Sequence, residues 1–171
     1  MTAATSEQEL ASQKIARRVV RAALFGVLAL ASPGFSRLAW AATMRHETTV
    51  ITTASGKTNI STEVAVSSTE QEQGLMFRTS IGDNDGMLFV YAKPQAIQMW
   101  MRNTYIPLDM VFIQPDGTVS RIETGAEPLS ERIIPSGPAA KAVLELKAGT
   151  ALRLGLKPGD HIESPAINAA P

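Results

Sequence analysis

The stretch Gly86–Ile113, GMLFVYAKPQAIQMWMRNTYIPLDMVFI, has the densest apolar content in the chain and an unusual polar insert, Arg102-Asn103-Thr104. Side chains on a strand alternate between its two faces, and this alternation predicts three strands. They cover about residues 86–91, 96–101 and 108–113. Ala92-Lys93-Pro94 is predicted to separate the first two, because proline has no amide donor for a sheet. The first strand is apolar on both sides, which indicates that both of its faces are covered.

Asp109 is a single charge within the third predicted strand. A buried carboxylate is costly unless it is paired or hydrogen-bonded. Arg102 is the predicted partner, because it lies near the other end of the same connection. One interpretation is a structural clamp on the loop 103–108, and the other is a polar site at the mouth of the sheet. Structural ion pairs perturb charges as readily as functional sites do, so the sequence favours the clamp.

Methionines gather in and just before this stretch, and two explanations remain open for them. Methionine adapts to irregular gaps, so these side chains are predicted to fill the core. The alternative is a soft groove for an apolar ligand or peptide. The residues concerned are Met76, Met87, Met99, Met101 and Met110.

The N-terminus predicts a targeting segment over residues 1–41. Paired arginines, Arg17-Arg18, precede an apolar run, Ala22–Ala31, and Ala39-Trp40-Ala41 fits a small-x-small cleavage site. An apolar run of about ten residues is too short to span a bilayer, which needs about 20. We therefore expect cleavage after Ala41 and a periplasmic or secreted protein. The arginines resemble a twin-arginine signal; the general export route and an uncleaved anchor are the alternatives.

The charge balance limits the classes of partner. The 171 residues carry 16 basic and 16 acidic side chains, and removal of residues 1–41 leaves 11 basic and 14 acidic ones, a net charge of −3. That balance disfavours binding to nucleic acid or to an anionic membrane through charge. The expected partner is an envelope ligand or protein. No stable membrane span is expected after cleavage, and the protein is expected to be a monomer.

The rest of the chain predicts short strands and turns. Residues 42–57 are predicted to form a loose leader up to Glu47 and then the first strand. The main domain is expected at 58–164 and a frayed tail at 165–171. A helix is expected to start within 67–73, with Thr69 and Glu72, or Ser68 and Gln71, as a capping box. The predicted fold class is mainly β, a single compact β-sandwich or barrel-like domain with one or two short helices. Further strands are expected at 48–53, 58–67, 118–124 at an edge, 141–146 and 161–163, with a long irregular segment at 125–138 and a helix at 150–156.

The sequence predicts no cofactor and no metal. Zinc needs three or four convergent ligands, whereas cysteine is absent and His46 and His161 are the only histidines. Residues 82–86 superficially resemble a calcium loop, but Ile81 and Ala92 stand where acidic ligands are required. The chain also lacks a glycine-rich phosphate loop, a dinucleotide fingerprint and a GxSxG nucleophile elbow.

Several blocks of residues follow one another in a distinctive order. They are Gly74-Leu75-Met76 with Arg78, Gly86-Met87-Leu88-Phe89, Trp100-Met101-Arg102-Asn103-Thr104, Ile106-Pro107-Leu108-Asp109, and Val143-Leu144-Glu145-Leu146 with Gly149. In this order the blocks closely resemble the signature of the domain of unknown function 192 (DUF192) family. They cover about residues 58–163. Arg102 stands where the family usually has lysine, and Met99 where an aromatic residue is common.

The resemblance implies a compact, mainly β domain and no established activity. It points to the polar signature positions as the place to look for a site, namely Arg78, Arg102, Asn103, Thr104, Asp109 and Glu145.

Three hypotheses about function follow. The first is a periplasmic binding or accessory domain with a polar-rimmed groove beside Trp100. The second is a hydrolase or lyase acting on envelope glycan, with Asp109 and Glu145 as the acid and base. The third is a structural or chaperone-like domain that binds a partner through the 125–138 loop or a sheet edge.

Overall fold

A long β hairpin begins the part of the chain that the structure describes. The computed structural model describes residues 44–169, so the predicted signal peptide, residues 1–41, lies outside them. Strands β1 (Arg45–Thr53) and β2 (Gly56–Ala65) pair antiparallel from Arg45 opposite Val64 to Thr53 opposite Gly56. The β-branched residues of both strands favour this conformation. Arg45–Glu47 belong to β1, so the expectation of a loose leader up to Glu47 is wrong: pairing with β2 orders these residues.

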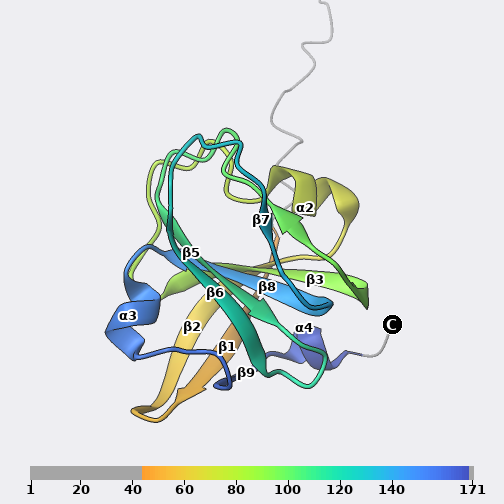
Figure 1. Cartoon of the computed structure of the whole chain (residues 1–171), viewed down its shortest axis with the longest axis vertical. Coiled ribbons are helices and arrows are strands. Elements are labelled where there is room, and N and C mark those ends of the chain that lie inside the picture. Colours follow the sequence, from red (N-terminus) through yellow and green to blue (C-terminus); the bar gives the residue numbers. More distant parts are fainter. Residues whose placement is uncertain (1–43, 170–171) are drawn as a thin grey trace, which may run out of the picture. The chain divides into compact units, whose positions relative to one another are not determined.

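The described residues form a compact unit around a curled seven-stranded sheet (Figure 1). Its order is β6-β5-β8-β3-β2-β1-β9. The remaining strands of this sheet are β3 (Asp85–Gln95), β5 (Leu108–Ile113), β6 (Val119–Ala126), β8 (Ala140–Lys147) and β9 (His161–Glu163). A second sheet pairs β4 (Gln98–Met99) with β7 (Ile134–Pro135). The predicted mainly β fold is confirmed, and β6 lies at an edge as expected.

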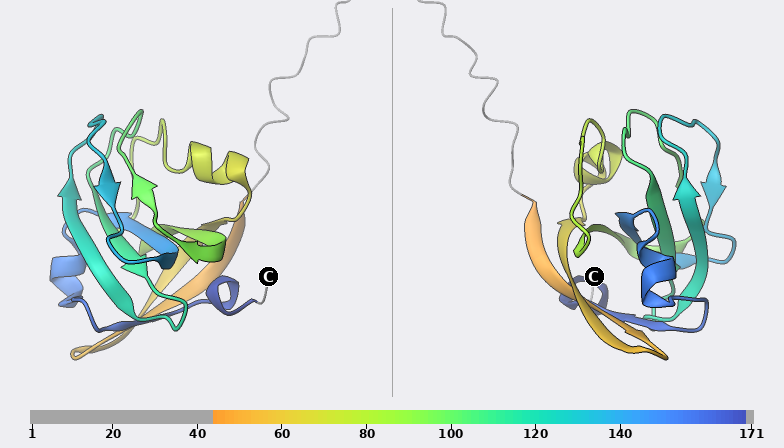
Figure 2. Two further views of the ribbon diagram at one scale, coloured as in Figure 1. Left: turned by 45° about the vertical axis from the view of Figure 1, so that its right-hand side comes forward. Right: turned by 90° about the vertical axis from the view of Figure 1, so that its left-hand side faces the viewer.

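Three short helices occur within residues 44–169. They are α2 (Ser68–Gln73), α3 (Thr150–Leu154) and α4 (Pro165–Asn168). Strands β2 and β3 are parallel, and α2 lies in the crossover between them. Figure 2 shows β1 and β2 curling away from β5 and β6, with α2 at one end of the sheet.

Apolar side chains cover both faces of the central strands. Leu88, Val111 and Leu144 belong to one buried cluster, and Met87, Phe89 and Met110 belong to the other. Neighbouring residues of β3 and β5 thus alternate between the two clusters, as the pleat of a strand requires. The prediction that β3 is covered on both faces is confirmed for its buried part, residues 86–90.

Two predicted boundaries in the central stretch are wrong. β3 continues through Pro94 to Gln95, with an irregular register between Val90 and Gln95. The exposed extension loses regular pairing there, so the missing amide of Pro94 costs the sheet little. Strand β4 contains two residues only, because its partner β7 is equally short. Ile97, Met99 and Met101 are nevertheless buried, as the alternation predicts.

Two predictions about helix ends also need correction. The capping box of α2 is formed by Ser67 and Glu70, one or two residues before the pairs expected from spacing. The chain after Ser164 is not a frayed tail up to residue 169. Ala166 and Ile167 of α4 are buried in the core, and the Ser164 side chain accepts a hydrogen bond from the Ala166 amide.

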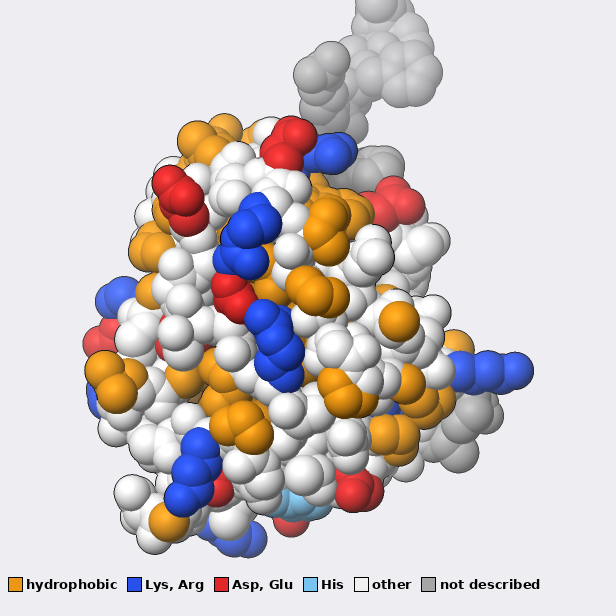
Figure 3. All heavy atoms as spheres, in the orientation of Figure 1, with side chains coloured by type: hydrophobic (Ala, Val, Ile, Leu, Met, Phe, Trp, Pro, Cys, Tyr) orange, Lys and Arg blue, Asp and Glu red, His pale blue; other side chains and the backbone are white. Residues whose placement is uncertain are grey.

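The surface shown in Figure 3 mixes both signs of charge with exposed hydrophobic side chains. Arginines on this domain form ion pairs with nearby carboxylates, among them Arg121 with Glu123 at 2.5 Å. Phe77 and Tyr105 are 62% and 49% exposed, and their rings meet edge to face.

Candidate functional site

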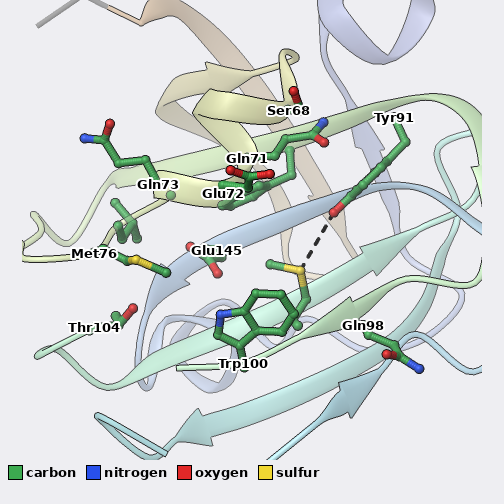
Figure 4. Close-up of a pocket in the computed structure, with 14 residues that line it drawn as sticks. Ser68, Gln71, Glu72, Gln73, Met76, Tyr91, Gln98, Trp100, Thr104 and Glu145 are labelled. Carbon is green, nitrogen blue, oxygen red and sulfur yellow. Dashed lines mark hydrogen bonds between the residues drawn. The ribbon is translucent and has the colours of Figure 1, made fainter. Parts of the chain in front are cut away.

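A pocket of about 220 Å³ opens between α2, the end of β3 and the segment 98–104 (Figure 4). The chain brings distant residues together there. Gln71 comes from α2, Tyr91 from β3, Trp100 and Thr104 from the loop after β4, and Glu145 from β8. Thus Trp100, Thr104 and Glu145, three residues predicted from sequence, share one site.

Glu145 is the buried acidic group of this pocket. Only 4% of the residue is exposed, and its neighbours across the sheet are Met87 and Met110. No hydrogen bond or ion pair links its carboxyl group to another residue of the described part of the chain. Burial raises the pKa of Glu145 to about 8, because the apolar surroundings disfavour the charged form. At neutral pH the carboxyl group is therefore mostly protonated.

Aromatic and sulfur-containing side chains form the walls around Glu145. Tyr91 donates a hydrogen bond from its hydroxyl to Met99 Sδ at 3.9 Å. Burial, and then the negative charge of Glu145, raise the pKa of Tyr91. Trp100 is 39% exposed, and the Arg102 guanidinium lies 5.6 Å from the centroid of its ring. This arrangement is a cation–π contact at the rim of the pocket.

The loop that carries Trp100 is held by backbone contacts around Asn103. Asn103 has φ of 56°, a left-handed conformation that asparagine tolerates better than most residues. Its carbonyl accepts a hydrogen bond from the Phe77 amide at 2.8 Å, and its side-chain amide donates to Met76 Sδ at 3.8 Å. The Thr104 carbonyl accepts from the Leu129 amide at 3.0 Å. Asn103 and Thr104 therefore position the loop against its neighbours.

Contacts at both ends of helix α2 and through one of its side chains hold the helix over the pocket. The Ser67–Glu70 capping box satisfies free amides at the start. Gln71 donates from its side chain to the Val90 carbonyl at 2.9 Å, which joins α2 to β3. Gly74 ends the helix with φ of 47°, and an added Cβ there would lie 3.0 Å from the Phe89 ring. The close approach of α2 to β3 therefore favours glycine at this position.

Asp109 lies on the opposite face of the sheet from Glu145. In the pairing of β5 with β8, Met110 is opposite Glu145 and Asp109 is opposite Leu146. Adjacent residues of a strand point to opposite faces. The Asp109 oxygens accept hydrogen bonds from the Gly125 and Ala151 amides, both at 2.9 Å. Asp109 thus ties β5 to β6 and to the start of α3.

The predicted pairing of Arg102 with Asp109 is wrong. Arg102 forms an exposed ion pair with Glu131, with 3.4 Å between Nε and the carboxylate oxygen. Asp109 is fully buried and its hydrogen bonds come from backbone amides. The structural interpretation of Asp109 therefore fits its contacts, although its partners are not the predicted arginine.

Arg78 lies outside the Glu145 pocket. It forms an ion pair with Glu63 at 2.6 Å, and both residues line a separate depression together with His46 and Ser61. Of the six polar positions that the family resemblance singled out, two line the Glu145 pocket, namely Thr104 and Glu145.

Sequence reasoning missed the contributions of α2 and of Tyr91. The sequence places Gln71 and Glu72 in a helix and Tyr91 in a strand, and it indicates no site role for any of the three. The alternation along β3 does predict that Tyr91 shares a face with Met87 and Phe89. The position of α2 depends on the parallel crossover from β2 to β3, which no local pattern specifies.

A family model described as "Uncharacterized ACR", DUF192, matches residues 50–164. The chain belongs to the DUF192 family. The resemblance stated from the signature blocks is thus confirmed, and nearly all of the described fold, including the pocket, falls within the matched range.

Two solved structures show the same fold. One is a protein of Sinorhizobium meliloti whose description proposes a role as a transcription regulator; it is 44% identical, with a TM-score of 0.70. The match covers 72% of this chain and 96% of that one. The other, a protein of unknown function from Novosphingobium aromaticivorans, is 41% identical, with a TM-score of 0.70, and the match covers 72% and 88% of the two chains. A comparison with curated proteins found no significant match.

Residues 44–169 contain neither a candidate membrane span nor a candidate metal site. None of the helices there has the length and apolar content needed to cross a bilayer. In the same range, no three side chains of histidine, aspartate or glutamate converge as a metal site would require.

Proposed function

We propose that this DUF192 protein is an exported binding domain that holds a small ligand in the pocket between α2 and Trp100. The observation that carries the proposal is Glu145, a carboxyl group that is almost fully buried and has no partner among the described residues. The carboxyl group faces the cavity, where a bound ligand can supply the partner that it lacks.

The rest of the pocket supports recognition rather than turnover. Small-molecule sites are concave and mainly apolar, with a few polar groups that orient the ligand. Here Phe89, Met99 and Trp100 supply apolar surface. The polar groups come from several residues of α2 and from Gln98, Thr104 and Glu145. Trp100 with its stacked Arg102 forms part of the rim, close to the polar-rimmed groove expected beside Trp100.

The hypothesis of a carboxylate pair is less well supported by the geometry. An acid and a base acting on one glycosidic bond must face the same substrate, about 5–10 Å apart. Asp109 and Glu145 project from opposite faces of the sheet, and both oxygens of Asp109 are bound by backbone amides. Of these two acids, only Glu145 has an unpartnered carboxyl group and lines the pocket beside Trp100.

Two other roles have weaker support. The Sinorhizobium relative is described as a transcription regulator, which raises the hypothesis of DNA binding for this chain. Residues 44–169 carry 11 basic and 14 acidic side chains, and this balance disfavours binding to DNA through charge. The partner-binding hypothesis stays a prediction; Leu129 and Ile133 are exposed in its proposed loop.

A screen of the purified protein against small envelope metabolites tests the proposal. Met76 lines the pocket and points into it (Figure 4), so Met76→Trp is expected to fill the cavity. The neighbouring Phe77 is 62% exposed and does not line it, so Phe77→Trp is the matched control.

We expect at least one compound to raise the melting temperature of the parent and of Phe77→Trp by several degrees, and to leave Met76→Trp unchanged. Equal shifts in all three proteins would place binding elsewhere and contradict the proposal. A screen in which no compound shifts the parent would also count against it.

A further inference from the structure

We propose that the ligand is a small organic cation, an alkylammonium group that binds the Glu145 carboxylate in the pocket lined by Trp100 and Tyr91. This inference rests on the proposed binding function and specifies the class of ligand. It depends on the charge of the pocket, on its aromatic walls and on the lack of a partner for Glu145.

The charged groups that line the pocket are all acidic. Glu145 lies on β8 and Glu72 on α2, and no lysine, arginine or histidine of the described chain lines the cavity. Arg102 stacks on Trp100 at the rim and pairs with Glu131, and neither Arg102 nor Glu131 lines the cavity. A ligand carboxylate or phosphate would face two acids without a counter-charge, whereas a cation would complete the site.

Aromatic faces next to a carboxylate favour cations with an apolar body. The negative face of an aromatic ring attracts ammonium groups, with tryptophan the strongest of the three aromatic residues. Trp100 already binds one cation, the Arg102 guanidinium, at 5.6 Å. Tyr91, Phe89 and Met99 line the same cavity, so the alkyl chain of the ligand would lie against apolar and polarisable groups.

The pH dependence of binding distinguishes a cationic ligand from a neutral one, because Glu145 can be protonated or charged. The pKa of Glu145 is about 8, so below that pH an ammonium ligand must displace its proton. Glu72 and Tyr91 also face the cavity, and Tyr91 titrates well above this range because its pKa is raised above its ordinary value near 10. Cation affinity should therefore rise about tenfold from pH 6 to pH 7 and level off above pH 8. A neutral hydrogen-bond acceptor would show the opposite trend, since it needs the protonated acid.

Three matched probes test the inference on the purified protein. Hexylammonium, 1-hexanol and hexanoate share one alkyl chain and differ in charge. Binding is measured by calorimetry from pH 6 to pH 9 for the parent, Glu145→Gln and the control Glu127→Gln. Glu127 is exposed and does not line the pocket.

We expect hexylammonium to bind the parent and Glu127→Gln alike, with the pH dependence given above and with proton release below pH 8. Above pH 8, Glu145→Gln should bind it at least tenfold more weakly than the parent does, and its binding should lack that pH dependence. Hexanol or hexanoate binding as tightly as hexylammonium would overturn the inference, as would unchanged binding by Glu145→Gln.

The two proposals fail in different ways. If Met76→Trp abolishes the binding of hexanol but charge has no effect, the pocket binds ligands and the cation inference is wrong. If Met76→Trp changes the binding of none of the probes, hexylammonium included, and the metabolite screen also fails, the binding function is wrong as well.

Discussion

Glu145 makes the stability of the fold depend on pH in an unusual direction. Burial raises its pKa from 4.5 to about 8, so between these values the folded protein holds a proton that the unfolded chain releases. The contribution of Glu145 to stability is therefore fully favourable below pH 4.5 and is lost as pH rises to 8. The loss is about 1.4 kcal/mol per pH unit, roughly 4–5 kcal/mol in all.

Glu145→Gln removes this titration while keeping the size of the side chain. We expect the free energy of unfolding of the variant, relative to the parent, to increase by several kcal/mol between pH 4.5 and pH 8.5. Urea unfolding at closely spaced pH values measures this difference. The free energy of unfolding of Glu127→Gln should change with pH as that of the parent does. A parallel curve for Glu145→Gln would show that the carboxyl group titrates normally.

The sequence predicts which residues share a face of one strand, but not which strands meet. Alternation places Asp109 and Met110 on opposite faces of β5, and Leu144 and Glu145 on opposite faces of β8. Only the register, Met110 opposite Glu145, shows that the two carboxyl groups face away from each other. The sequence therefore predicts Asp109 and Glu145 as a pair, whereas the sheet places them on opposite faces.

Asp109 links three secondary-structure elements through its hydrogen bonds. It lies in β5, and its oxygens accept hydrogen bonds from Gly125 of β6 and from Ala151 in the first turn of α3. Asparagine has one acceptor oxygen, so one of these amides would face an NH₂ group. Hydrogen bonds to charged groups contribute about 1.5–3 kcal/mol, and an unsatisfied buried donor adds to the loss.

Asp109→Asn is therefore expected to lower the free energy of unfolding by about 2–4 kcal/mol, measured by urea or thermal unfolding. Asp116→Asn is the control, because Asp116 accepts one exposed hydrogen bond from the Thr118 amide in a turn. An unchanged melting temperature for Asp109→Asn would contradict the structural role. Ligand affinity at temperatures where the variant is folded should be retained, since Asp109 faces away from the pocket.

Local patterns predicted most elements of the sheet, and tertiary contacts decided the exceptions. β5 begins and ends where alternation predicted, at Leu108 and Ile113. α4 was missed because PAIN (residues 165–168) is too short to show a helical period, and its order comes from burying Ala166 and Ile167. The ends of β4 depend on the length of β7, which its own sequence does not specify.

For the whole molecule, the N-terminal pattern predicts export. Residues 1–41 lie outside the described residues, so the proposal depends on Arg17-Arg18, the apolar run and the Ala39-Trp40-Ala41 site. Expression of the full chain in a bacterial host should give a periplasmic protein that begins at Ala42, measured by mass spectrometry of the fractionated cells.

Substituting both arginines, Arg17→Lys with Arg18→Lys, separates the two export routes. We expect the double variant to stay in the cytoplasm with its N-terminus intact, because twin-arginine recognition requires the pair. Normal export of the variant would assign the protein to the general route. A parent protein that keeps residue 1 and stays in the cytoplasm would contradict export itself.

The most direct test of the pocket is the titration of Glu145 itself. Carbon-13 NMR of the side-chain carboxyl groups, assigned with Glu145→Gln, would follow its ionisation in the ligand-free protein. The structure predicts a midpoint near pH 8, moved to lower pH by hexylammonium. A midpoint near 4.5, unmoved by the ligand, would mean that Glu145 is solvated or paired, and would contradict its role as the unpartnered acid of a binding site.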